Sequence, residues 1–239
     1  MAARATGCAM LAESSVQEVM DLSAVAHLTA IKTRVPFINF FDGFRTSHEI
    51  QKIQIWDYED LKPLVDMEAV QAFRERALNP DAPVTRGTAE NPDVYFQHRE
   101  ASNKFYLALP DVVEHYMGEV NKLAGTNYQL FNYIGAPDAT DVIVTMGSSA
   151  QVVVSTVDYL NKLGRKVGFI NVHLFRPFAT DRLLKALPKT VERIAVLDRT
   201  KEPGALAEPL FLDVQAAVVD GGLNVKVIAG RYGLSSKDI

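Results

Sequence analysis

A dense set of polar side chains directly follows a short apolar run near the start of the chain. Residues 35–41 read Val-Pro-Phe-Ile-Asn-Phe-Phe without regular alternation of polar and apolar side chains, which predicts a strand buried on both faces in a parallel sheet. Ligands of open parallel sheets bind beyond the carboxyl ends of the strands, so the polar set is a candidate site wall or domain interface. It comprises Asp42, Gly43, Arg45, Thr46, Ser47, His48 and Glu49.

The same polar set also has a purely structural interpretation. Thr46 and Glu49 have the three-residue spacing of a capping box, and Asp42-Gly43 is common turn chemistry. On this interpretation the residues only end a strand and start a helix. Sequence alone leaves both interpretations open.

A glycine-serine turn in the second half of the chain is a weaker candidate for binding. Residues 147–149, Gly-Ser-Ser, precede a predicted helix, and the amides of a helix N-terminus attract anions. Ser148 and Gln151 also have the spacing of an ordinary capping box, which is the simpler explanation.

A charged loop is predicted at residues 198–204, Asp-Arg-Thr-Lys-Glu-Pro-Gly. Arg199, Lys201 and Glu202 lie close together in it. The loop is either a docking surface or a solvated turn, whose exposed ion pairs would contribute little to stability.

Composition excludes several classes of partner. Of the 239 residues 48% are hydrophobic, enough for the cores of one or two soluble domains. The net charge is −4, and no basic cluster is present, so nucleic acid is not an expected partner. No apolar run reaches the length of a membrane span and the N-terminus lacks a signal core, so we expect a cytoplasmic protein without membrane contact.

Cysteine and histidine usage argues against a metal centre. Cys8 is the single cysteine, which excludes a disulfide framework, a cysteine-based zinc site and an iron–sulfur cluster held by this chain alone. The five histidines never form a His-x-x-x-His pair. We therefore predict no metal site.

The N-terminal region predicts a helix and a strand that need extensive cover. Ser14 and Gln17 have capping-box spacing, and apolar residues at steps of three and four continue to about Lys32. This helix is apolar nearly all round and must be buried on most sides, as must the strand at 35–41. Either the C-terminal part of the chain covers them, or further elements of the same domain precede Met1.

The middle of the chain has the character of an arm. Helices are predicted at 57–65, 66–78 and 111–124, the last with Asp111 and Glu114 at capping-box spacing and Gly125 at its end. Residues 79–110 are rich in Pro, Asn and Gly, and a connection that long usually serves a function or wraps over a surface.

Strands and helices alternate from residue 141 onward. Strands are predicted at 142–146, 167–172, 194–197 and 225–228, and helices at 151–163, 181–187 and 208–219. This alternation implies right-handed crossovers and a parallel sheet flanked by helices.

Several stretches together resemble the pyruvate:ferredoxin (flavodoxin) oxidoreductase family. The resemblance runs from about Thr6 to Ile239. It rests on Pro36-Phe-Ile-Asn-Phe-Phe-Asp-Gly-Phe-Arg-Thr-Ser-His-Glu-Ile50, Arg86-Gly-Thr-Ala-Glu-Asn-Pro-Asp-Val-Tyr-Phe-Gln97, Gly135-Ala-Pro-Asp-Ala139, Val142-Ile-Val-Thr-Met-Gly-Ser148, Arg176-Pro-Phe178 and Leu197-Asp-Arg-Thr-Lys-Glu-Pro-Gly-Ala205.

The resemblance implies an α/β fold in three parts. Residues 1–56 would be the C-terminal part of a pyrimidine-binding, thiamine-enzyme-type α/β domain, and residues 57–133 an extended helical linker arm. Residues 134–239 would be a three-layer, parallel-sheet domain that resembles the C-terminal domain of transketolase. The chain would thus be an internal fragment of a protein several times longer.

The family decarboxylates pyruvate oxidatively to acetyl-coenzyme A. It uses thiamine diphosphate with Mg²⁺, passes electrons through [4Fe-4S] clusters to ferredoxin or flavodoxin, and is expected to be a homodimer at full length. The family's thiamine-binding Glu and Thr and its substrate Arg would lie before Met1, and its cluster cysteines after Ile239. The resemblance therefore places no catalytic, cofactor-binding or metal-binding residue on this chain, and implies a cytoplasmic enzyme, or a hydrogenosomal one in an anaerobic protist.

Two functions remain in competition at this stage. In the first, the chain is a segment of the enzyme that is inactive alone and partners with the remaining domains, with Asp42 to Glu49 in the wall between domains. In the second, it is a non-catalytic docking module that binds through the arm and the 198–204 loop.

Overall fold

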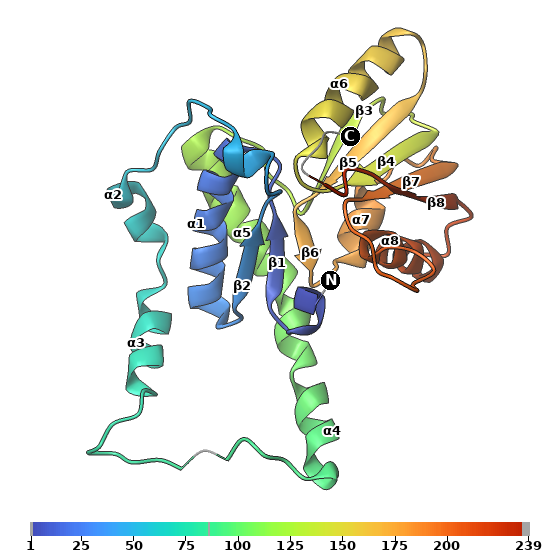
Figure 1. Ribbon diagram of the computed structural model, residues 1–239. Helices are drawn as coiled ribbons and strands as arrows, with labels where there is room; N and C mark the ends of the chain where they lie inside the picture. The colour runs from blue at the N-terminus through green and yellow to red at the C-terminus, as the bar shows by residue number, and fades with distance from the viewer. Residues whose placement is uncertain (1, 86, 236–239) are drawn as a thin grey trace.

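A computed structural model describes residues 2–85 and 87–235, so Arg86 and residues 236–239 of the predicted segments lie outside the described residues. The chain forms a three-stranded sheet and a five-stranded sheet, with a long helical arm extending from the first (Figure 1). Within the described residues no helix is both long and apolar enough to cross a membrane.

The small sheet combines strands from both halves of the chain. Its order is β2 (Phe37–Phe40), β1 (Ala9–Ala12) and β6 (Leu174–Arg176). β1 is parallel to β2 and antiparallel to β6. The C-terminal half of the chain thus supplies part of the cover that the N-terminal elements need, through a strand that sequence patterns did not predict.

The strand predicted at 35–41 is confirmed as β2, but its burial was predicted wrongly. All four residues of β2 are only half-buried, because β2 lies at the edge of the small sheet. The fully buried strand is β1, which was missed because its four residues, Ala-Met-Leu-Ala, carry no strong strand preference.

α1 (Val16–Thr33) follows β1 and packs against β2 and α5 (Asn103–Ala124). The predicted capping pair is wrong by one residue. Ser15 is the N-cap, and its hydroxyl accepts the amide of Glu18, whereas Glu18 Oε2 accepts the amide of Ser14 at 2.6 Å. Only the bond from the Glu18 amide to the Ser15 hydroxyl is a capping-box bond, because the Glu18 carboxylate binds the amide of the residue before the N-cap.

The arm is more helical than predicted. α2 (Tyr58–Leu61), η3 (Lys62–Leu64) and α3 (Met67–Glu75) confirm its first two helices, with Asp57 and Asp66 as N-caps. α4 (Pro92–Ala101) and the first turns of α5 replace the predicted irregular connection.

α5 passes through Pro110 without ending there. Leu109, Val113, Met117 and Val120 are buried on one face of α5, and packing of that face on α1 outweighs the local disruption by proline. The predicted cap at Asp111 and Glu114 is wrong, because α5 begins at Asn103 and Asp111 lies within the helix. Both carboxylates pair with Arg182 instead.

Limited proteolysis is expected to cut the arm before any other part of residues 9–231. Every described residue of 74–91 is exposed, and no other element packs closely over this stretch (Figure 1), so local opening there requires little free energy. Mass spectrometry of the first tryptic products should place cleavage in this stretch, after Arg74 or Arg76. Initial cleavage within α1, at Lys32, would contradict the packing of α1 on α5.

The large sheet has the order β3-β5-β4-β7-β8. β4 (Asp141–Thr145), β5 (Val167–Val172), β7 (Arg193–Asp198) and β8 (Lys226–Arg231) are mutually parallel, as predicted. β3 (Phe131–Gly135), which was not predicted, is an antiparallel edge strand beside β5.

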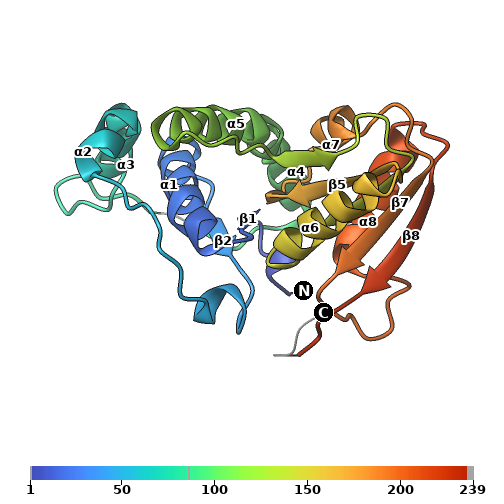
Figure 2. The same ribbon diagram turned by 90° about the horizontal axis from the view of Figure 1, so that it is seen from above.

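Helices cover both faces of the large sheet, which confirms the three-layer prediction (Figure 2). α6 (Ser149–Lys162) packs in a small core with Phe169, whereas α7 (Thr180–Ala186) and α8 (Pro209–Asp220) contribute to the main core. β5 belongs to the large sheet and β6 to the small one, and His173 alone separates them. The chain thus passes directly from one sheet to the other at His173.

Candidate functional site

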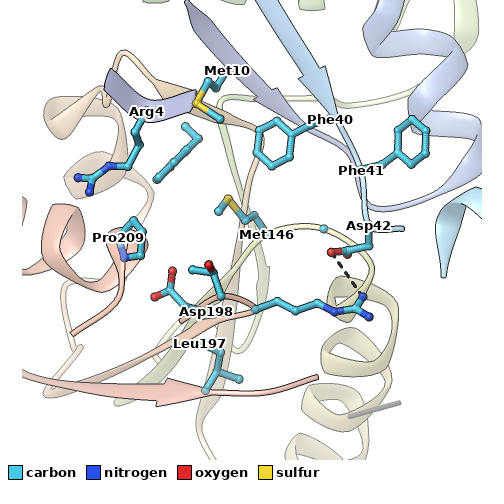
Figure 3. Close-up of a pocket in the computed structure, with 13 residues that line it drawn as sticks. Arg4, Met10, Phe40, Phe41, Asp42, Met146, Leu197, Asp198 and Pro209 are labelled. Atoms are coloured by element: carbon cyan, nitrogen blue, oxygen red, sulfur yellow. Dashed lines mark ion pairs between the residues drawn. The ribbon is translucent and has the colours of Figure 1, made fainter. Parts of the chain in front are cut away.

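A pocket of about 270 Å³ lies where the two sheets meet. It is bounded by residues at or just beyond the carboxyl ends of β2, β4 and β7 (Figure 3), the edge at which parallel sheets bind ligands. Most of its wall is apolar and includes Met10, Phe40, Phe41, Met146, Phe175 and Leu197.

Asp42, Ser148 and Arg199 form a polar contact at one end of this pocket, which we term the latch. Asp42 Oδ2 accepts the backbone amide of Ser148, and Asp42 Oδ1 lies 3.4 Å from Arg199 Nη1 (Figure 3). The same guanidinium nitrogen donates to Ser148 Oγ at 3.3 Å. The latch therefore links the end of β2 to the β4–α6 turn and to the loop after β7.

Arg199 also forms hydrogen bonds with the segment that follows β8. Its Nε donates to the carbonyl of Gly233 at 2.8 Å and its Nη2 to the carbonyl of Ser235 at 3.1 Å. With every guanidinium nitrogen bonded and the side chain 14% exposed, Arg199 serves as a clamp within the protein. It is therefore not a free cation for an external anion.

The glycine-serine turn does receive an anion, but the anion comes from the chain itself. The carboxylate of Asp42 occupies the N-terminus of α6, where the helix dipole favours negative charge. The predicted capping box of Ser148 and Gln151 is wrong, because the Ser148 side chain caps no amide of α6.

The other residues of the predicted polar set do not join the latch. Thr46 and His48 lie in η2 (Thr46–His48), a single 3₁₀ turn, so the predicted capping box at Thr46 and Glu49 is wrong. Thr46 is buried, His48 stacks on Phe44 with ring centroids 5.4 Å apart, and Arg45 and Glu49 are exposed.

The rest of the 198–204 loop divides in a similar way. Lys201 is exposed beside Asp42 and Arg199, in an open hollow outside the pocket. Glu202 contributes its backbone amide, which donates to Glu208 Oε2 at 2.7 Å. Of the eight predicted site residues, Asp42 and Arg199 pair with each other.

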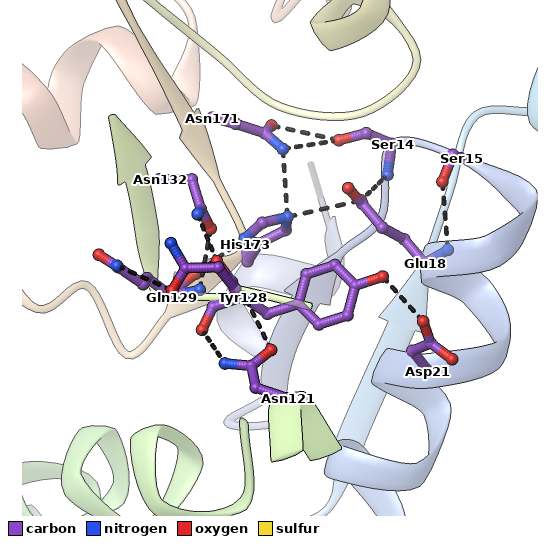
Figure 4. Close-up of polar contacts among 11 residues, drawn as sticks. Ser14, Ser15, Glu18, Asp21, Asn121, Tyr128, Gln129, Asn132, Asn171 and His173 are labelled. Carbon is purple, nitrogen blue, oxygen red and sulfur yellow. Dashed lines mark hydrogen bonds and ion pairs between the residues drawn. The ribbon is translucent and has the colours of Figure 1, made fainter. Parts of the chain in front are cut away.

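A second polar cluster, which we term the seam, joins α1 to the crossing between the sheets (Figure 4). It consists of Ser14, Glu18, Asn171 and His173. The Asn171 amide lies 2.9 Å from Ser14 Oγ and 3.1 Å from His173 Nε2, and Glu18 Oε2 lies 3.4 Å from the same imidazole nitrogen. Ser14, Asn171 and His173 are buried, so these bonds form where water cannot replace them.

The seam lowers the pKa of Glu18 and holds a proton on one nitrogen of His173. Burial raises the pKa of Glu18, but hydrogen bonds from His173 and Ser14 and the charge of His173 outweigh burial, so the pKa is lowered overall. His173 Nδ1 lies 2.8 Å from the carbonyl of Gln129, which can only accept, so Nδ1 carries a proton.

Sequence reasoning missed the seam entirely. Its one visible signal was Asn171, a polar residue in the otherwise apolar run of β5, Val-Gly-Phe-Ile-Asn-Val. Its partner Ser14 lies 157 positions earlier, a separation that no local pattern encodes.

Metal ligation finds no support in the described ranges, 2–85 and 87–235. No group of three or more His, Cys, Asp or Glu side chains there is placed to hold a metal ion.

Comparison with known proteins gives the same family for both halves of the chain. Residues 1–118 match the family described as pyruvate flavodoxin/ferredoxin oxidoreductase, thiamine diphosphate-binding, and residues 139–239 match pyruvate:ferredoxin oxidoreductase core domain II. The whole chain is 63% identical to the pyruvate-flavodoxin oxidoreductase of Enterobacter agglomerans and 60% identical to the pyruvate:ferredoxin oxidoreductase of Moorella thermoacetica. It spans 20% of the length of each relative.

A solved structure supports the fold. The 2-oxoglutarate:ferredoxin oxidoreductase from Magnetococcus marinus superposes with a TM-score of 0.54 over 95% of this chain and 39% of its own, at 16% sequence identity. At that identity the likeness concerns the fold alone.

Proposed function

Because the chain belongs to the pyruvate flavodoxin/ferredoxin oxidoreductase family, we propose that it forms a paired α/β module of an enzyme that converts pyruvate to acetyl-coenzyme A. In this proposal the module is structural. It holds two domains of the enzyme in a defined relative position, and catalysis requires the rest of the enzyme.

The observation that carries this proposal is the pair of contacts between the two family-matched regions. Residues 1–118 and 139–239 match separate parts of the family, and the latch joins Asp42 of the first to Ser148 and Arg199 of the second. The seam joins Ser14 to Asn171 in the same way. Asp42 and Arg199 bond within the protein, which suits a domain interface better than a ligand site or a docking surface.

The described residues do not fit thiamine diphosphate. Bound thiamine diphosphate supplies the electron sink that decarboxylation of a 2-oxo acid requires. The N-terminus of α6 has the character of a diphosphate site, but its Ser148 amide already donates to Asp42. The buried Asp198 carboxylate at the pocket accepts the amides of Leu210 and Phe211 at the start of α8.

We assign the remaining properties to the assembled enzyme. Its cofactors would be thiamine diphosphate with Mg²⁺ and [4Fe-4S] clusters, the latter beyond the capacity of a chain whose single cysteine is Cys8. Ferredoxin or flavodoxin would accept the electrons of a cytoplasmic homodimer. The domain boundaries at residues 56 and 133 are also part of this proposal. The end of the arm, formed by α5, packs on α1.

A segment exchange tests the proposed function. Replacing the matching 238 residues of the Enterobacter agglomerans enzyme by this chain should preserve pyruvate-dependent reduction of flavodoxin within about tenfold of the parent, because 63% identity preserves the contact surfaces. A folded chimera of parental solubility without this activity would contradict the proposal.

The isolated polypeptide is the control for the exchange. Calorimetric titration of the 239-residue chain with thiamine diphosphate and Mg²⁺ should show no binding, and the chain alone should not oxidise pyruvate. Tight binding would show that a cofactor site lies within these residues, in which case the module would be more than structural.

A further inference from the structure

Glu13 is a buried carboxyl group that neither the latch nor the seam uses. It directly follows β1, and its side chain is fully buried. Neither carboxyl oxygen has a hydrogen-bond partner among the described residues. Burial raises the pKa of Glu13 to about 8, against an opposing contribution from neighbouring Asn39 and with an additional rise from the charge of Glu18. A carboxylate buried without donors is so unfavourable that the group binds a proton.

Asn39, on β2, has a buried side-chain oxygen that lacks a hydrogen-bond donor in the part of the chain that the structure describes. Its Nδ2 donates to Ser23 Oγ at 2.8 Å, and the Ser23 hydroxyl donates to the carbonyl of Val19 at 2.5 Å. Because that hydroxyl proton is already used, Ser23 Oγ can only accept from Asn39, which fixes the orientation of the amide. Asn39 Oδ1 is then a buried acceptor without a donor among the described residues.

We propose that Glu13 is held as a neutral carboxylic acid that donates its proton to Asn39 Oδ1, and that loss of this proton loosens the seam. A single proton on Glu13 then gives a hydrogen-bond partner both to the Glu13 carboxyl group and to Asn39 Oδ1. The resulting chain of donors runs in one direction, from Glu13 to Asn39, to Ser23 and to the carbonyl of Val19 on α1.

Ionisation of Glu13 would place a second negative charge beside the seam. The charged neighbour on α1 is Glu18, and the crossing between β5 and β6 contributes His173, which contacts Glu18. β2, Phe37–Phe40, carries no ionisable side chain. Repulsion from an ionised Glu13 thus acts on the carboxylate that holds both Ser14 and His173.

The test compares Glu13→Gln with the parent sequence, both carrying Cys8→Ser so that no thiol is present in either protein. Glutamine keeps a donor for Asn39 Oδ1 but cannot ionise. Glu68→Gln, at an exposed glutamate, is the matched control. The measurements on the 239-residue chain are ¹³C NMR of the glutamate carboxyl groups and amide hydrogen exchange of β1, each from about pH 6 to about pH 9.5.

We expect one carboxyl signal, absent from Glu13→Gln, to titrate with a midpoint near 8. Above this pH, β1 amides of the parent should exchange about tenfold faster than those of Glu13→Gln at the same pH, a comparison that cancels base catalysis of exchange. Titration of Glu13 at the pH of an exposed glutamate would overturn the neutral-acid assignment. A midpoint near 8 without faster exchange would overturn the link to the seam.

Discussion

Replacing Arg199 by alanine is expected to lower the free energy of unfolding by about 2–4 kcal/mol, because it removes a partly buried ion pair and leaves the Asp42 carboxylate without its counter-charge. Asp42 keeps the amide of Ser148 but loses its counter-charge in a position where its side chain is 19% exposed. The carbonyls of Gly233 and Ser235 lose their donors as well. Urea unfolding followed by Trp56 fluorescence and circular dichroism measures the change.

Arg182→Ala is the matched control for the loss of an arginine with several partners. Arg182 pairs with Asp111, Glu114 and Asp181, but it is 31% exposed and its partners are 42–72% exposed. The three exposed pairs share one guanidinium, and an exposed ion-pair site contributes about 0–1 kcal/mol, so this variant should lose about 1 kcal/mol, less than Arg199→Ala. Equal losses for the two variants would show that Arg199 has no special place in the junction.

The parts of the fold that sequence predicted are those that local periodicity determines. β5 matches its predicted limits, and α3 and α6 begin and end within about three residues of theirs, because each has a one-sided apolar stripe or an uninterrupted apolar run. β1, β3 and β6 were missed. Each is three to five residues long, and each exists because a distant strand pairs with it.

The candidate site was found in two pieces whose relation sequence could not show. Asp42 and the turn at Gly147 were each selected for local chemistry, one as a polar residue after a strand and the other as an anion-attracting helix start. The two residues in contact, Asp42 and Ser148, are 106 positions apart in the sequence. Local chemistry can name a donor and an acceptor, but only the packing of two sheets brings them into contact.

The misassigned caps have a common physical cause. Capping boxes at Ser14, Asp111 and Ser148 fitted the spacing rule, yet each of these residues bonds elsewhere: Ser14 to Asn171, Asp111 to Arg182, and Ser148 to Arg199. A side chain that can cap a helix can equally well satisfy a distant partner, whether that side chain is buried, as Ser14 is, or exposed, as Asp111 is.

Gly147→Ala is expected to disrupt the latch from the opposite side, at a cost of about 3 kcal/mol in the free energy of unfolding. Gly147 has φ +82°, and a Cβ atom there would lie 2.5 Å from Asp42 Oδ2. Asp42 cannot move away without giving up the Ser148 amide or Arg199. Urea unfolding again provides the measurement.

Gly164→Ala separates the backbone effect from the contact with Asp42. Gly164 has nearly the same conformation, φ +79°, but a Cβ atom there would meet nothing within 4 Å, so its replacement should cost only the conformational penalty of about 1 kcal/mol. In an Asp42→Ala background, Gly147→Ala should fall to this same value, which gives a coupling energy of about 2 kcal/mol between the two positions. An unchanged cost in that background would mean that Gly147 is required by its backbone alone, and that its closeness to Asp42 contributes nothing to the latch.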